Sequence, residues 1–433
     1  MRSALLLASG MLALAACDRP LVAPDAPTIE VVSPDLDAVQ PGGGVELRIE
    51  AGALRGVERV TVNGAEAERD VSGLWVRREV LAPGANAFVL EAFAADGSTA
   101  ADTAFAIALP LAALPLASTL PEPRAGHTAT ATAAGVLVAG GTGEGERVLV
   151  TARLASELAS GFVFGDPIAL ASPRTGHTAT ALPDGRVLLL GGTVTPAPEP
   201  PASFAATPEA VDPASGESRA VVVEGVPLRR TGHVVTLIED GGRLLLTVLG
   251  GRAPATDGRV FTPGAIEFFE LHLGAEADTL VRLSPAGGIG GPANLPDPAQ
   301  IGLGVDAAET LLAGLASGAS ALRLTYSVPG FTTPVEVDAE VPGLPFEPRT
   351  EADGVRLGEG LALLAGGAGA GGGPLASMEV YAERARRFFR APVRLSTPRR
   401  AHTVTLAPSG RILVLGGRDA SDRPTPTLEV IAF

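Results

Sequence analysis

RTGHTATALPDGRVLLLGG, the stretch from Arg174 to Gly192, is the unit from which most of this chain is built. A short β-prone run from His177 to Leu182 leads into a PDG turn, and an apolar run from Arg186 to Leu190 follows before the closing glycine pair. This pattern predicts a tight β-hairpin. Two strands alone are marginally stable in water, so the fold depends on recurrence of the hairpin.

The hairpin recurs at intervals of roughly fifty residues. Three further copies keep the pattern well, namely RAGHTATATAAGVLVAGG from Arg124, RTGHVVTLIEDGGRLLLTVLGG from Arg230 and RRAHTVTLAPSGRILVLGG from Arg399. A copy from Arg349 has Ala352 in the histidine place, and one from Asp297 keeps only the turn and the apolar strand. The starts at 124, 174, 230, 297, 349 and 399 predict six units.

Each unit is expected to continue with two more strands after a variable loop. Candidates for the third and fourth strands are Ser377 to Tyr381, Gly264 to Phe269, Ala210 to Pro213, Phe162 to Leu170 and Phe388 to Leu395. The last unit ends with Leu428 to Phe433 and lacks one strand, which we expect Leu111 to Leu120 to supply. Such closure would remove the open edge of a split ring.

These repeats resemble the kelch family, whose units carry a hairpin ending in two glycines, a later E-x-Y-D/N-P-like strand and a period near fifty. The likeness covers about three quarters of the chain. It implies an all-β fold, with a six-bladed kelch-type β-propeller over residues 111–433. The unit from Asp297 departs most, because it lacks the glycine pair and the histidine.

Residues 28–109 follow a different pattern, in which short alternating strands are separated by Asn-Gly, Pro-Gly and Asp-Gly turns. Their number and spacing predict a small β-sandwich. The runs VTVNG from Val60, LAPGAN from Leu81 and AADG from Ala94 resemble bacterial immunoglobulin-like modules. Trp75 is expected to be the core aromatic residue of this domain.

The N-terminus reads as a secretion signal, with Arg2 before an apolar run from Ala4 to Leu14 that is too short to span a bilayer. The sole cysteine, Cys17, completes an LAAC sequence that resembles a bacterial lipobox, and this implies lipidation at Cys17. The alternative is an ordinary signal with a chance cysteine. We expect a signal peptide over 1–16 and a lipidated tether over 17–27. The protein is then expected to be secreted across the inner membrane and anchored by its lipid in the bacterial envelope, facing the periplasm or on the cell surface.

Composition and motifs exclude several classes of function. The formal charge is -15, all 33 basic residues are arginine, and only 4% of residues are aromatic, so we expect no nucleic-acid partner. No GxSxG, HExxH or phosphate loop is present, and the glycine-rich run from Gly366 to Gly373 has no helix pattern after it. We therefore predict no catalytic residues and no cofactor.

Histidines share one place in four of the units, at His127, His177, His233 and His402. A ring of metal ligands is one interpretation, but each histidine would belong to a different unit, too far dispersed for a zinc or iron site. We favour the interpretation that each histidine braces its own blade, and we predict no metal.

Arginines recur three residues before the histidine place, at Arg124, Arg174, Arg230, Arg349 and Arg399. Up-and-down connectivity places them beside the loops that follow the glycine pairs, which carry Glu144, Glu146, Arg252, Asp257, Arg418, Asp419 and Asp422. The five arginines with Glu144, Arg252 and Arg418 form a candidate ligand face, suited to carboxylates through bidentate hydrogen bonds. The competing and favoured interpretation is that each arginine bridges adjacent blades.

Three hypotheses for the function follow. The first is a binding module, anchored to the membrane through its N-terminal lipid, whose propeller binds a protein or a glycan. The second is a carbohydrate-active enzyme similar to the kelch-type sialic acid mutarotases, using acid–base chemistry in the channel. The third is a structural scaffold with two flat faces. The absence of catalytic motifs favours binding over catalysis.

Overall fold

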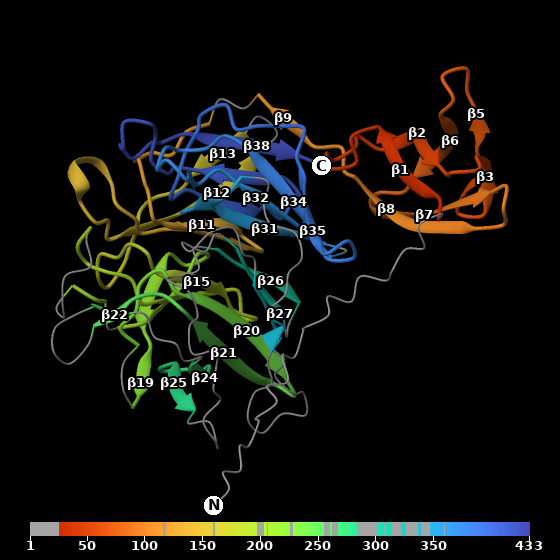
Figure 1. Ribbon diagram of the computed structural model, residues 1–433. Coiled ribbons are helices and arrows are strands. Elements are labelled where there is room, and N and C mark those ends of the chain that lie inside the picture. Colours follow the sequence, from red (N-terminus) through yellow and green to blue (C-terminus); the bar gives the residue numbers. More distant parts are fainter. Residues whose placement is uncertain are drawn as a thin grey trace, which may run out of the picture. The chain divides into compact units, whose positions relative to one another are not determined.

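The computed structural model describes most of the chain (Figure 1). The described residues are 26–115, 118–158, 161–196, 203–205, 207–225, 228–254, 260–261, 267–283, 301–306, 309–313, 322–325, 337–338, 347–358 and 360–433. They are almost entirely β-structure, with one 3-10 turn at Glu144–Glu146 and no α-helix. No helix in this part of the chain is long and apolar enough to cross a membrane. The chain divides into two compact units, of which the larger contains residues 105–433.

Two four-stranded sheets form near the N-terminus. One has the order β1 (Thr28–Ser33), β2 (Gly43–Gly52), β6 (Trp75–Leu81) and β5 (Glu68–Arg69), and the other β4 (Ala65–Glu66), β3 (Val57–Val62), β7 (Gly84–Ala94) and β8 (Thr99–Ala108). Leu47 and Ile49 of β2 are buried on either side of exposed Arg48, as expected of a strand that covers a core on one face. Trp75 is buried, as predicted.

In the described part of the remaining chain, six antiparallel meanders of four strands form, which we number as blades one to six in order of their first strands. Blade one contains β10 (Thr128–Thr132), β11 (Gly135–Ala139), β12 (Thr151–Leu158) and β13 (Gly161–Phe164), with β14 (Ile168–Ala169) beside β12. Blade two contains β15 (Thr178–Ala181), β16 (Val187–Leu190), β17 (Glu209–Asp212) and β18 (Glu217–Ala220). Blade three contains β20 (Val234–Asp240), β21 (Arg243–Leu249), β24 (Glu267–His272) and β25 (Thr279–Leu283), with β19 (Val222–Glu224) at its edge.

Blades four to six complete the series. Blade four contains β26 (Ile301–Asp306), β27 (Glu309–Ala313), β28 (Leu322–Thr325) and β29 (Val337–Asp338). Blade five contains β31 (Asp353–Gly358), β32 (Leu361–Ala365), β34 (Met378–Ala382) and β35 (Arg387–Arg390). Blade six contains β36 (Thr403–Leu406), β37 (Ile412–Leu415), β38 (Leu428–Ala432) and β9 (Ala112–Leu114). Short pairs lie in the loops, β22 (Ala253–Pro254) with β23 (Val260–Phe261) and β30 (Arg349–Thr350) with β33 (Ala368–Gly369).

The first strands of the six blades contact one another in cyclic order, from β10 through β15, β20, β26, β31 and β36 back to β10. The sheets therefore stand around a common axis, and this part of the chain is a β-propeller (Figure 1). The ring is closed as predicted, because β9 pairs antiparallel with β38, for example Ala113 with Ile431.

The apolar second strand of each hairpin supplies the packing between blades. In β16, Val187 and Leu189 join a buried cluster with Leu137 of blade one, while the alternate residues of the strand pack with Leu246 of blade three. A strand buried on both faces needs a continuous apolar run instead of an alternating one, which explains the sequence VLLL. Each such side chain contributes about 1.5–3 kcal/mol when fully buried.

Candidate functional site

The double glycines are joints between neighbouring blades. Gly191 has φ +62°, and a Cβ there would lie 2.3 Å from the Arg230 carbonyl oxygen of blade three. The next residue, Gly192, donates its N–H to the same carbonyl at 2.7 Å. Gly417 donates in the same way to the Arg124 carbonyl at 2.7 Å, so the joint also closes the ring between blades six and one. Only glycine combines this backbone conformation with so close an approach.

The five recurrent arginines lie in the interior of the propeller. The Arg174 guanidinium donates to the Gly191 carbonyl at 3.3 Å and to Glu209 of β17 at 2.5 Å, and both side chains of this ion pair have no exposed surface. Equivalent pairs within one blade are Arg230 with Glu267, Arg349 with Glu379 and Arg399 with Glu429.

These positions correct two interpretations of the arginines. They do not present an exposed ligand face, because Arg124, Arg174, Arg230, Arg349 and Arg399 are at most 3% exposed and their guanidinium groups bond within the protein. Their side chains also do not bridge blades. Each head group braces its own blade, and in every case but Arg349 the backbone carbonyl of the same residue accepts a hydrogen bond from the glycine pair of the preceding blade. A buried charge needs such a partner, which the third-strand glutamate provides.

Blade one departs from this ion pairing. Its third strand carries Arg153 opposite Val138, where blade two has Glu209 opposite Leu189. Glu122 lies 3.6 Å from the Arg124 guanidinium and 3.5 Å from that of Arg153 and takes the place of the missing carboxylate. Burial lowers the pKa of Arg124 to about 10, so the side chain remains charged at neutral pH.

The histidines link neighbouring blades. His177 Nε2 lies 3.0 Å from Thr128 Oγ1 of blade one, and His127 Nε2 lies 3.0 Å from Thr403 Oγ1 of blade six. His233 pairs in the same way with Thr178, at 3.1 Å. The prediction that each histidine braces its own blade is therefore corrected, because the hydrogen bond crosses to the preceding blade.

The same histidines are neutral at physiological pH. Burial is the main cause that lowers the pKa of His127, His233 and His402 to about 3, and the arginine three residues earlier in each blade acts in the same direction. His177 is shifted in the same sense by the same causes. The Nδ1 atoms of all four histidines are buried and have no hydrogen-bond partner among the described residues.

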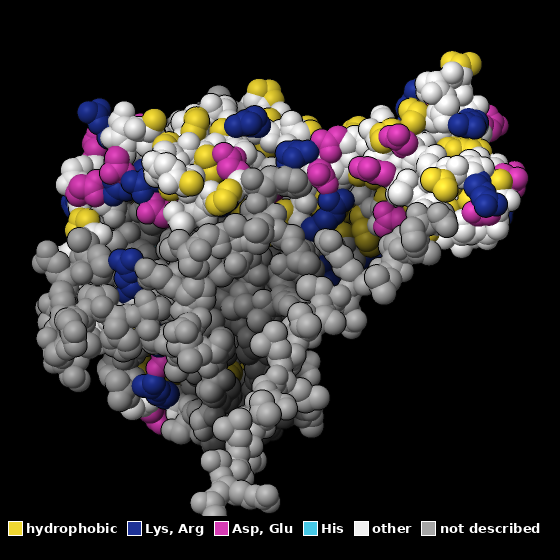
Figure 2. Space-filling model, viewed as in Figure 1, with side chains coloured by type: hydrophobic (Ala, Val, Ile, Leu, Met, Phe, Trp, Pro, Cys, Tyr) yellow, Lys and Arg dark blue, Asp and Glu magenta, His cyan; other side chains and the backbone are white. Residues whose placement is uncertain are grey.

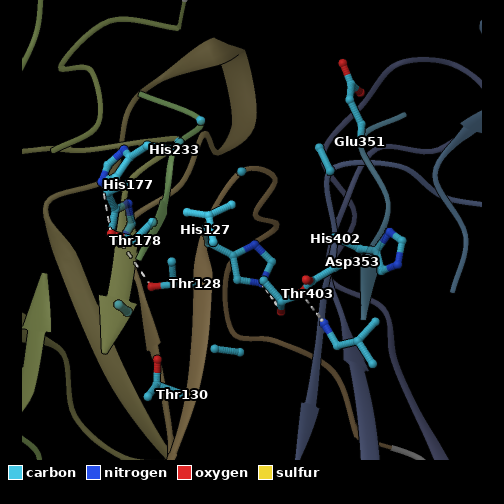
Figure 3. A pocket seen from close by; sticks show the side chains of 18 of the residues that line it. His127, Thr128, Thr130, His177, Thr178, His233, Glu351, Asp353, His402 and Thr403 are labelled. Atoms are coloured by element: carbon cyan, nitrogen blue, oxygen red, sulfur yellow. Dashed lines mark hydrogen bonds between the residues drawn. The ribbon is translucent and has the colours of Figure 1, made fainter. Parts of the chain in front are cut away.

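A cavity of about 390 Å³ opens where the first strands converge (Figure 3). It is lined by the four histidines and their neighbours in the repeat, and Figure 3 shows Thr128, Thr178 and Thr403 holding the histidine bonds beside it. Its remaining lining residues are Gly126, Ala129, Thr130, Gly176, Ala179, Gly232, Val234, Val235, Glu351, Ala352, Asp353, Ala401 and Val404. We call this cavity the channel mouth.

Blade five interrupts the repeated lining. In place of a Gly-His-Thr sequence it carries Glu351, Ala352 and Asp353. Asp353 Oδ2 accepts a hydrogen bond of 2.7 Å from the Val404 N–H of blade six, instead of bonding the histidine of that blade. Burial raises the pKa of Asp353 to about 7, against the opposing effect of the Val404 and Gly354 N–H groups. Neither carboxylate was predicted as a site residue, although the break in the repeat at Ala352 was a signal for both.

His402 is the histidine that blade five leaves without a threonine. It is 4% exposed, and neither ring nitrogen makes a well-formed hydrogen bond to a described residue. The Ala365 carbonyl lies near the ring and acts to raise its pKa, but burial outweighs this effect. Unsatisfied buried polar atoms are rare in proteins, and here they border a cavity.

A chain of ion pairs surrounds part of the mouth. Arg400 pairs with Glu351 and, at 2.6 Å, with Asp422, and Arg418 pairs with Glu146 at 2.6 Å. These residues come from blades five, six and one, so the segments that lead into the first strands and the loops after the glycine pairs do share one face. On the face seen in Figure 2, acidic and basic side chains are interspersed over the described part of the surface.

The three remaining members of the predicted ligand face lie on the loops after the glycine pairs. Glu144 is exposed in the 3-10 turn, Arg252 is exposed, and Arg418 takes part in the ion pairs of the rim. Cys17, the signal segment and Asp257 lie outside the described residues. Among the residues that are described, no group of three or more histidine, cysteine, aspartate or glutamate side chains has a metal-binding arrangement.

Comparison with known proteins identifies the fold. No protein-family model matches the chain, and no curated protein is similar in sequence. A solved structure described as "Structure of YjhT" matches with a TM-score of 0.51 and 14% identity, over 73% of this chain and 97% of that chain. The propeller is thus a known, kelch-like architecture. At this identity the likeness concerns the fold alone.

Proposed function

We propose that this protein is a lipid-anchored protein of the bacterial envelope, in which an immunoglobulin-like domain precedes a six-bladed kelch-type propeller that binds a glycan at the channel mouth. The observation that carries the proposal is the concave, polar lining of the mouth, with buried histidine nitrogens that have no partner in the described part of the protein. Its volume is within the range of small-ligand sites.

Of the two partner classes predicted from sequence, protein and glycan, the lining favours a glycan. Protein interfaces depend on large aromatic, methionine or arginine anchors at their centre. The described lining has none of these, and offers threonine hydroxyls, neutral imidazoles and carboxyl groups instead. Such groups match the hydroxyls of a sugar, which donate and accept hydrogen bonds.

A glycan array probed with the full-length protein in detergent tests this proposal. Thr130→Trp would place a large side chain in the mouth and should abolish binding that the wild-type protein shows. The control is Thr99→Trp on the exposed end of β8, which should leave binding unchanged. Equal binding by the wild type and the Thr130→Trp variant would place the ligand elsewhere and overturn the proposal.

A second candidate is a carbohydrate-active enzyme similar to the sialic acid mutarotases. The pKa of Asp353, near neutrality, is suited to general acid–base catalysis and favours this alternative. The described lining has no arginine to receive the sugar carboxylate, which opposes it. NMR detection of faster exchange between the two anomers of sialic acid, lost in Asp353→Asn, would establish the enzyme.

The membrane anchor has its own test. Wild-type protein should incorporate a labelled fatty acid and partition into detergent, while Cys17→Ser should do neither. An unlabelled wild-type protein would leave an ordinary secretion signal as the explanation of the N-terminal sequence.

A further inference from the structure

Blade five carries charge at the place where the other blades carry none. The residue before the histidine place is Gly126, Gly176, Gly232 or Ala401 in four blades, and in blade five it is Glu351. All five have a positive φ, which is +49° at Glu351. A long side chain is rarely accommodated in this left-handed region, and residues held in it cluster at functional sites.

The charged groups of the described lining are both acidic. Glu351 and Asp353 are the two acidic residues in the lining: Glu351 is paired with Arg400, which lies outside the lining, and burial raises the pKa of Asp353 to about 7. The four histidines there are neutral. The five recurrent arginines are engaged inside their own blades. The described lining thus contains acidic groups and no arginine, and Arg400 beside it is shared between Glu351 and Asp422.

Asp353 and His402 also leave hydrogen-bonding capacity unused. In blades one, two and six the threonine at the Asp353 place bonds the histidine of the next blade. Asp353 bonds the Val404 backbone instead, and His402, nine-tenths buried beside it, has the Ala365 carbonyl near its ring but no well-formed hydrogen bond among the described residues. The carboxyl groups and this imidazole provide acceptors on one side of the mouth.

We infer that the channel mouth is selective for a sugar that bears a protonated amine, with the ammonium group held by Asp353 and attracted by the more exposed Glu351, and the sugar hydroxyls held by the histidines and threonines of the other blades. This inference rests on the proposed function, because it names the ligand class of the same site. An ammonium group donates three hydrogen bonds and is attracted to carboxylates, whereas the carboxylate of an acidic sugar would be repelled.

Short glucosamine oligomers and their N-acetylated counterparts differ only at the amine, where acetylation removes the charge and adds an acetyl group; the corresponding glucose oligomers, with a hydroxyl in that place, are the uncharged probe without added bulk. Calorimetric titration of the full-length protein in detergent at physiological ionic strength should show the free amine form binding at least tenfold more tightly. Asp353→Asn and Glu351→Gln, which keep the side-chain shape, should each remove that preference. Glu144→Gln makes the same charge change on an exposed loop outside the lining and should preserve it.

The outcomes separate this inference from the function on which it rests. Equal affinity for the two oligomers, with both blocked by Thr130→Trp, would keep the glycan site and overturn the amine selectivity. A preference weakened equally by Glu144→Gln would reflect general attraction to a chain of charge -15 and would also overturn it. Binding of neither oligomer, together with an empty glycan array, would overturn both.

Discussion

In blade two the residues that lead into β15 are Gly176, His177 and Thr178, whereas in blade five Glu351, Ala352 and Asp353 lead into β31. Each of these segments follows a buried arginine that is paired with a third-strand glutamate, and each begins with a positive φ. The scaffold is therefore the same, and the difference is confined to side chains that line the channel mouth. Residues that most blades repeat support the ring, while blade five, which departs from the repeat, carries the two acidic residues of the lining.

The largest expected effect comes from the shared part of the two blades. Arg174→Ala in blade two and Arg349→Ala in blade five should each lower the free energy of unfolding by about 3–5 kcal/mol, because each leaves a buried glutamate without its partner. Urea unfolding at pH 7 measures the change.

Arg219→Ala is the matched control. Its ion pair with Glu217 is 59% and 64% exposed, so the cost should stay below about 1 kcal/mol. A much smaller cost for Arg349→Ala than for Arg174→Ala would contradict the claim that blade five is held as the other blades are.

Acid should destabilise the blades that are linked by a histidine–threonine hydrogen bond. The folded-state pKa of His233, about 3, lies below the ordinary value of 6.5, so its contribution to stability is present above pH 6.5 and is lost as the pH falls toward 3. On acidification from pH 7 to 4.5, His233→Gln should lose about 2–3 kcal/mol less stability than the wild type. Unfolding curves at the two pH values measure this, and parallel losses in the two proteins would refute it.

Blade five should show the opposite dependence on pH. The pKa of Asp353 is raised from 3.8 to about 7, so its stabilising contribution is present below pH 3.8 and is lost as the pH rises through 7. Asp353→Asn, which retains an acceptor for the Val404 N–H, should be more stable than wild type by about 1–2 kcal/mol at pH 8, allowing for solvent access through the mouth.

The stability difference between Asp353→Asn and the wild type should vanish near pH 4. Glu351, Arg400 and His402 are the charged or titratable groups near Asp353 on the described elements, and the variant leaves all three in place. A constant difference across pH 4 to 8 would show that Asp353 does not titrate in this range.

The smallest expected effect on stability comes from a substitution that makes the start of blade five resemble that of blade two. Glu351→Gly relieves the left-handed conformation and should raise the free energy of unfolding by no more than about 1 kcal/mol, because the ion pair with Arg400 is lost at the same time. The same variant should lose the preference for free amine oligomers. Thermal unfolding and calorimetric titration test the pair of effects, and a variant that is stabilised with unchanged selectivity would remove Glu351 from the site.

Much of the propeller was predictable because each hairpin follows from a local sequence pattern that is repeated along the chain. The PDG turn and the apolar run before Gly191 indicated β15 and β16, and the unpaired last strand indicated that residues 111–120 would close the ring, as β9 does. The roles of the repeated polar residues were not predictable in this way. Their periodicity showed that Arg174 and His177 serve the fold, but not which blade each side chain contacts.

Four features were therefore placed incorrectly or missed. The histidines were expected to brace their own blades, and three of them bond the preceding blade instead. The arginines were expected on a face or between blades and lie inside one blade, with Glu209 and its equivalents as partners. The recurrent glutamate of the third strand was visible in the sequence, but its pairing depends on a register between strands thirty or more residues apart. The carboxylates of blade five were overlooked because they occur once.

By itself, the sequence determined the elements and their order: hairpins, apolar second strands and glycine pairs are set by turn chemistry and by burial of each strand between two neighbours. The tertiary structure alone decided which polar groups meet. Closing the ring brings Thr403 within 3.0 Å of His127 and places Glu351 and Asp353 at the mouth with the four histidines, although the residues come from opposite ends of the propeller. Such contacts depend on how sheets stand around an axis, and no local pattern encodes that arrangement.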